Sequence, residues 1–155
     1  MGHPDDNDIR TEFLNVDLDV FSRESLAPFV KALERSFFVL HEGRWGRKYG
    51  AILELHASGY GKRTADSIIR RMSALLNKMP DSARELWNRA QIRQFNIGIQ
   101  AARKPVAVEF QVGQDTLQAV SRLGASLVIT VYAPEARKPK STVRPKKRIS
   151  RPTTG

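Results

Sequence analysis

The stretch Phe13-Leu-Asn-Val-Asp-Leu-Asp-Val20 decides the fold class, because apolar and polar side chains alternate strictly along it. In a β-strand, successive side chains point to opposite faces of the sheet. The alternation predicts a strand with one buried and one solvated face. The buried face carries Leu14, Val16, Leu18 and Val20, and the solvated face carries Asn15, Asp17 and Asp19. The sheet containing this strand therefore needs a cover on one side only.

Helices and further strands are predicted on the C-terminal side of this strand. A helix follows Ser25, which can cap it, and Pro28 falls in its first turn, where a missing N–H is tolerated. Residues 37–41 and 49–57 are predicted to pair as a hairpin, and residues 64–79 to form an amphipathic helix. The next helix begins at Ser82-Ala-Arg-Glu85, which has the form of a capping box. Strands at 94–100 and 106–112, a helix at 115–123 ended by Gly124, and a strand at 126–132 complete the pattern.

The predicted element order is βαββααββαβ. Helical crossovers between strands favour an α+β fold, a two-layer sandwich in which a mixed sheet of about six strands carries its helices on one face. We expect an arrangement related to the ferredoxin-like fold. Residues 11–134 are predicted to form a single domain, flanked by a disordered N-terminus at 1–10 and a disordered basic tail at 135–155.

The net charge of +10 is concentrated in that tail, where residues 136–155 hold eight basic side chains and no acid. The rest of the chain carries 18 basic and 16 acidic residues, a net charge of +2. The sequence contains no cysteine, no signal-peptide pattern and no apolar run of the roughly 18 residues that a membrane span needs. A cytoplasmic protein without disulfides, thiolate metal sites or membrane insertion is expected.

Three segments resemble a known bacterial family. They are Met79-Pro-Asp-Ser-Ala-Arg-Glu-Leu-Trp87, Phe95-Asn-Ile-Gly-Ile-Gln100 and Thr116-Leu-Gln-Ala-Val-Ser-Arg-Leu-Gly124, the last leading to Val131-Tyr132. Over roughly residues 12–133 the chain resembles the family called domain of unknown function 4279. Some members of that family are discussed as immunity-like proteins beside toxins, so the resemblance implies a toxin-neutralising role and supplies no catalytic residues.

Motifs for familiar enzyme chemistry are incomplete in this sequence. His41-Glu42 lacks the second His that a zinc protease needs on the same helix. Gly59-Tyr-Gly-Lys-Arg-Thr64 lacks the first Gly of a P-loop. The favoured interpretation is a plain glycine turn before a helix. The alternative is a weaker anion site, in which Lys62 and Arg63 lie beside the free N–H groups of the helix start. Asp17 and Asp19 have a spacing compatible with a carboxylate pair, but an open sheet face favours a solvated acidic ladder. No cofactor or metal is predicted.

The solvated faces of the predicted strands combine into a polar platform, unless they are ordinary exposed sheet surface. Its members are Asn15, Asp17, Asp19, Glu54, His56, Asn96, Gln100, Glu109, Gln111 and Thr130, with Gly98 leaving a gap in the middle. The hairpin tip adds Arg44, Trp45, Arg47 and Tyr49, a combination of cations and rings suited to nucleic acid or to protein hot spots. Trp45 has the alternative of packing onto the core.

We therefore expect a non-enzymatic protein that binds a macromolecular partner, most simply a protein. The expected partner-binding residues are Arg44, Trp45, Arg47 and Tyr49 at the hairpin and Asp17, Asp19, His56 and Asn96 on the platform. The alternative is a nucleic-acid-associated protein that uses the tail and the basic loops, with Lys62, Arg63, Lys146, Lys147 and Arg148 as binding residues. An enzyme on the polar face would require a deep pocket enclosing Asp17, Asp19 and His56.

Overall fold

β1 (Glu12–Ser22) is the central strand of one mixed sheet. The structure is a computed structural model that describes residues 10–56, 63–103 and 107–134. Within that part of the chain, the sheet has five strands in the order β2 (Phe37–Trp45), β3 (Lys48–Leu55), β1, β4 (Ile92–Gln100) and β5 (Ser126–Tyr132). The helices are α1 (Ala27–Leu33), α2 (Ala65–Asn77), α3 (Asp81–Arg89) and α4 (Gln114–Arg122). The expected α+β class is confirmed.

The strand directions explain how the helices come to cross the sheet. β1 runs antiparallel to both β3 and β4, and β2 and β3 form the predicted antiparallel hairpin. β2 is therefore parallel to β1 with β3 between them, and β4 is parallel to β3 with β1 between them, which makes two interlocked split β-α-β units. β5 is added at the edge, parallel to β4, through α4.

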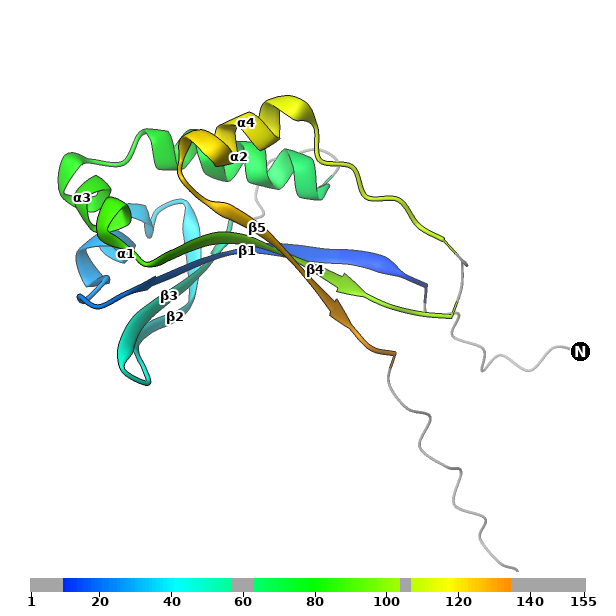
Figure 1. Cartoon of the computed structure of the whole chain (residues 1–155), viewed down its shortest axis with the longest axis horizontal. Helices are drawn as coiled ribbons and strands as arrows, with labels where there is room; N and C mark the ends of the chain where they lie inside the picture. Colours follow the sequence, from blue (N-terminus) through cyan, green and yellow to red (C-terminus); the bar gives the residue numbers. More distant parts are fainter. Residues whose placement is uncertain (1–9, 57–62, 104–106, 135–155) are drawn as a thin grey trace, which may run out of the picture.

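The helices lie on one face of a strongly twisted sheet (Figure 1). α2 and α4 lie side by side over the middle of the sheet, and α1 and α3 lie together at the end near the β2–β3 hairpin. No described helix covers the opposite face, which we call the open face. The two-layer arrangement follows from the alternation in β1, because only one side of that strand is apolar.

The expected sixth strand is wrong for the residues that the structure describes. Residues 107–112 lead into α4 without strand pairing, and Val106 lies outside the described residues. The free edge of β4 is taken by β5, and a parallel pair requires the chain to return across the sheet through a crossover. Residues 107–112 belong to that crossover, so their alternating side chains have no neighbouring strand to pair with.

A bulge in β1 changes the faces expected for its first residues. The register with β4 shifts between Phe13 and Asn15, leaving Leu14 as the extra residue. Phe13 packs against the core, while Leu14 is 44% exposed, so the prediction that Leu14 shares the buried face is wrong. An inserted residue reverses the alternation on one side of the bulge. Val16, Leu18 and Val20 are buried as expected.

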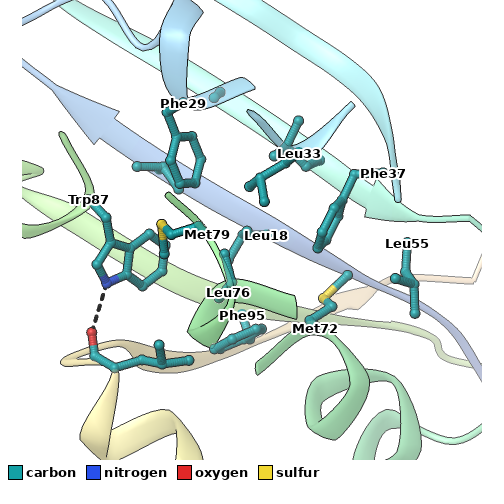
Figure 2. Close-up of a cluster of buried hydrophobic side chains, with 14 of the residues drawn as sticks. Leu18, Phe29, Leu33, Phe37, Leu55, Met72, Leu76, Met79, Trp87 and Phe95 are labelled. Atoms are coloured by element: carbon teal, nitrogen blue, oxygen red, sulfur yellow. Dashed lines mark hydrogen bonds between the residues drawn. The ribbon is translucent and has the colours of Figure 1, made fainter. Parts of the chain in front are cut away.

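The core lies between the sheet and the helices (Figure 2). Leu18 and Phe95 rise from the sheet toward Met72 and Leu76 of α2, and Trp87 of α3 stacks on Phe29 of α1 with ring centroids 5.9 Å apart. Burying side chains of this size contributes roughly 1.5–3 kcal/mol each before entropy is counted. The helices hold their places over the sheet mainly through this packing.

Helix ends agree with the sequence at some positions and differ at others. Thr64 caps α2 in a reciprocal capping box with Ser67, and Gly124 has a φ of 63° just after α4. α3 begins instead at Asp81 with Pro80 in the capping position, so Ser82 lies inside the helix and no side-chain cap bond forms. Ser25 accepts a hydrogen bond from the Ala27 N–H at 3.3 Å, one residue earlier than a capping residue of α1 would stand.

Candidate binding surface on the open sheet face

The strand register gathers polar side chains at the centre of the open face. Asp17 lies opposite Glu54 of β3 on one side and opposite Asn96 of β4 on the other. Asp19, two residues along the same strand, lies opposite Ile52 and Gln94. Two of the predicted partner-binding residues on β1 are thus brought together with Asn96, as the platform prediction requires.

Hydrogen bonds join these side chains in two neighbouring groups, which together we call the polar network. Asp19 Oδ2 accepts from Gln94 Nε2 at 3.0 Å and from Asn96 Nδ2 at 3.4 Å. Asn96 Oδ1 in turn accepts from the Thr130 hydroxyl at 2.7 Å, which links β4 to β5. Asn15 Nδ2 donates to Asp17 Oδ1 at 3.0 Å. Each amide is therefore fixed in orientation by its neighbours.

The carboxylates of this network are not a solvated ladder, so that expectation is wrong. Asp19 is only 7% exposed although it lies on the face away from the helices. The pKa of Asp17 is raised to about 6, mainly by burial and also by the nearby negative charges of Asp19 and Glu54. Long side chains on the neighbouring strands remove water from the centre of the face, which alternation along a single strand does not reveal.

An aromatic cluster lies at the hairpin end of the open face. The rings of Phe21 and Trp45 meet edge to face at 5.9 Å, and those of His41 and Trp45 meet edge to face at 5.0 Å. Phe21 lies against Gly50, where an added Cβ would come within 2.9 Å of its ring. Trp45 remains 54% exposed, so it packs on this cluster rather than entering the core.

The other hairpin residues do not share a face with Trp45. Arg44 places its guanidinium over the Tyr49 ring at 5.0 Å, and these two residues are register partners on β2 and β3. Because successive strand residues alternate, Arg44 and Tyr49 point to the opposite side of the hairpin from Trp45. Arg47 lies exposed in the turn beside Gly46. The predicted hairpin site is therefore divided between two surfaces.

His56, Glu109 and Gln111, which were also predicted for the platform, lie away from the polar network. His56 packs on Phe38 with ring centroids 4.0 Å apart, at the opposite end of β3 from the aromatic cluster. Glu109 and Gln111 line a cavity on the helical side, so their expected place on the platform is wrong. They were assigned there through the sixth strand, which does not form. The gap expected at Gly98 is filled, because an added Cβ would meet Asn15 Oδ1 at 2.7 Å.

The cavity at the start of α2 has a volume of about 620 Å³. Its walls are Phe13 of β1, residues 63–66, and Glu109, Phe110, Gln111 and Gly113. Asp66 occupies the first turn of α2 and accepts a hydrogen bond from the Gly113 N–H at 2.8 Å. Arg63 lies 3.9 Å from Glu54 Oε1. A carboxylate already at the helix start and an acid facing Arg63 both weaken the predicted anion site.

The remaining candidate basic residues lie outside the described part of the chain. They are Lys62 and the tail residues Lys146, Lys147 and Arg148. Sequence reasoning also missed Gln94, Phe21 and His41 as members of the open face. Continuing the alternation of β1 by two residues identifies Phe21, but Gln94 and His41 become neighbours of the polar and aromatic side chains only through strand register.

Across residues 10–56, 63–103 and 107–134, no group of three or more His, Cys, Asp or Glu side chains is arranged to hold a metal ion. In the same residues no helix has the length and apolar character needed to span a membrane. Comparison of the chain with protein-family models, curated proteins and solved structures gives no match.

Proposed function

We propose that this protein is a non-catalytic binding protein that engages a macromolecular partner, most simply another protein, through the open face. The observation that carries the proposal is the combination, on one uncovered face, of the ordered polar network with the exposed ring of Trp45. The expected mechanism is occlusion of the partner's own site.

The polar network favours recognition because its side chains are already held in place. Asn96 is fixed on both sides, by Asp19 and by Thr130, so binding orders few further rotamers. Preorganisation of this kind lowers the entropy cost of association. A partner that supplies hydrogen-bond donors to the half-buried Asp17 also relieves the like-charge repulsion from Asp19 and Glu54.

The aromatic cluster supplies the apolar part of such an interface. Tryptophan is among the residues most enriched at energetic hot spots, where a buried ring is surrounded by polar contacts. Trp45 is held by Phe21 and His41 yet presents more than half of its surface. The ring is therefore preoriented for a partner.

The resemblance to domain of unknown function 4279 supports an immunity-type or toxin-neutralising protein, with a protein toxin as the partner. An enzyme that uses the open face is the less favoured alternative. The amides of Gln94 and Asn96 both donate to Asp19, and the cavity described above lies elsewhere, at the start of α2.

Affinity capture from the native cell lysate with quantitative mass spectrometry tests the proposal. Wild type, Trp45→Ala, Asp17→Asn and the control Leu117→Ala serve as baits; Leu117 is 46% exposed on α4, away from the open face. The control should retain a partner of the open face, and Trp45→Ala should lower the affinity for that partner about 30-fold or more. If every captured protein binds all four baits equally, the proposal is wrong.

A second candidate is a nucleic-acid-associated protein, favoured by the eight basic residues between 136 and 155. Binding of this kind is strongly salt-dependent and carries no base specificity. Fluorescence anisotropy with a single-stranded oligonucleotide compares the full chain with a variant whose eight tail cations are replaced by glutamine. Loss of affinity at about 0.15 M salt supports this candidate, and unchanged affinity removes it.

A further inference from the structure

β5 is an edge strand without the features that usually protect an edge. In the part of the chain that the structure describes, it pairs with β4 alone, so its other side is open. Its sequence, Ser126-Leu-Val-Ile-Thr-Val-Tyr132, contains no charged residue, no proline and no glycine. Ile129, Val131 and Tyr132 are 63%, 60% and 49% exposed. An exposed, uncharged apolar edge is a template for pairing with another strand.

The opposite edge of the same sheet is interrupted, although Phe38, Val39 and Leu40 in the first half of β2 are exposed. β2 has a register irregularity between Val39 and His41, and it carries Glu42 and Arg44 in the half that leads to the hairpin turn. Bulges and charges of this kind prevent edge-to-edge pairing. β5 has neither a register irregularity nor a charge, so its edge is the less protected of the two, as expected if β5 is covered in the working protein.

The helical layer covers only the beginning of β5. Leu127 packs against the core, whereas Ile129 and Val131 follow on the same face and are exposed. In Figure 1, β5 passes beneath the end of α4 and then extends away from the helices. The second half of the strand therefore presents apolar side chains together with an unpaired backbone edge.

We propose that β5 pairs antiparallel with β5 of a second copy of this chain, about a two-fold axis at Ile129. Residue 129 is the midpoint of β5, so this register pairs the whole length of both strands. On the helical side it places Ile129 opposite its own copy and Val131 opposite Leu127 of the other copy. The two sheets then form one continuous sheet with both open faces on the same side.

Self-pairing fits this strand because the unpaired backbone edge and the apolar side chains of β5 can each pair with the same groups of a second copy. A two-fold interface uses the same patch twice, so the patch must be self-complementary. The apolar side chains at 127, 129 and 131 face one another, and no like charges become opposed because β5 has none. The positive charge is concentrated in residues 136–155, so repulsion between copies is screened by salt and association tightens as ionic strength rises.

Sedimentation velocity of the full chain tests the pairing. We expect a species of twice the 17.5 kDa chain mass, stronger at about 0.5 M than at about 0.05 M salt. Ile129→Lys, which places a cation on each strand at the axis, is expected to give monomers. Leu40→Lys is the matched control, since Leu40 is 52% exposed on the opposite edge, and it is expected to remain dimeric. Circular dichroism checks that both variants are folded.

Cross-linking tests the register independently of the Lys variants. The chain has no cysteine, so a single introduced cysteine can form only an intermolecular disulfide. Residues directly opposite in an antiparallel pair have Cα atoms about 4.5–5.5 Å apart, within disulfide range. Ile129→Cys is expected to cross-link on mild oxidation, and Leu40→Cys is not. A monomer at all salt concentrations, or a dimer that survives Ile129→Lys while Ile129→Cys fails to cross-link, overturns the proposal.

Discussion

Trp87 Nε1 donates a hydrogen bond of 2.9 Å to the carbonyl oxygen of Leu123, which ties α3 to the C-terminal end of α4 (Figure 2). The indole is 1% exposed and the bond is buried. The last carbonyls of a helix have no partner within the helix, so an indole N–H supplies one here. The same ring stacks on Phe29, and through it the helices α1, α3 and α4 are joined in one layer.

Trp87→Phe removes this donor and leaves the Leu123 carbonyl buried without it. We expect the free energy of unfolding to fall by about 1–3 kcal/mol, since an unsatisfied buried group costs that much. Urea denaturation followed by circular dichroism measures the change. The chain has two tryptophans, and Trp45→Phe at the exposed position is the control, with an expected change within about 0.5 kcal/mol. Equal effects of the two variants would contradict the role given to the hydrogen bond.

Asp17→Asn is expected to stabilise the protein at neutral pH and to have little effect in acid. The folded-state pKa of Asp17 is raised from 3.8 to about 6. Between pH 3.8 and about pH 6, Asp17 is therefore protonated more in the folded state than in the unfolded state. Stability therefore falls as pH rises from about 3.8 through 6, and the ionised carboxylate destabilises the fold above that range. The asparagine keeps an oxygen that accepts from Asn15 and carries no charge. The gain at pH 7.5 should be about 1–3 kcal/mol.

Urea midpoints of wild type and Asp17→Asn at about pH 4 and pH 7.5 measure this difference. The gain must appear at the higher pH and nearly vanish at the lower one. A difference that is constant across pH, or a loss of stability at pH 7.5, would mean that the carboxylate is not held in a desolvated, like-charged site.

Asp66 fastens the crossover segment to α2. Its carboxylate accepts from the Gly113 N–H and pairs with Arg70, and the adjacent Thr116 hydroxyl is the largest influence that lowers its pKa. A lowered pKa contributes stability that is present above the ordinary value near 3.8 and is lost as pH falls through the folded value. Asp66→Ala should lower stability at pH 7 by about 1–3 kcal/mol.

Hydrogen exchange shows where the loss occurs, with faster exchange expected at the Gly113 amide in Asp66→Ala. Asp115→Ala is the control, because Asp115 is an exposed acid in the first turn of α4. If both variants leave the Gly113 amide equally protected, Asp66 does not hold the segment.

Thr64→Ala removes the side-chain oxygen that accepts from the Ser67 N–H at 3.1 Å. We expect a loss of about 1 kcal/mol, typical of a helix cap. Ser82→Ala, at a position that only resembles a cap in sequence, should change stability by no more than about 0.5 kcal/mol. Thermal unfolding of the two variants separates a real cap from an apparent one, and a larger effect at Ser82 would reverse the assignment.

The sequence by itself determined the features that depend on neighbouring residues. Alternation in β1 identified the strand and assigned Asp17 and Leu18 to opposite faces, and the residues Thr64 and Gly124 marked two helix ends correctly. These signals are reliable because side-chain direction, capping and positive φ are set by the local backbone.

Tertiary structure alone decided which of those local possibilities were realised. Residues 107–112 alternate as a strand does, yet they remain unpaired because β5 occupies the edge of β4. Ser82 has the pattern of a cap, but α3 already begins at Asp81, after Pro80, so Ser82 lies within its first turn. Asp19 belongs to a polar face by sequence and is buried because Gln94 and Asn96 come from a strand about 75 residues away. Strand pairing, burial and the open face arise from contacts between distant residues, and no short stretch of sequence contains both partners of such a contact.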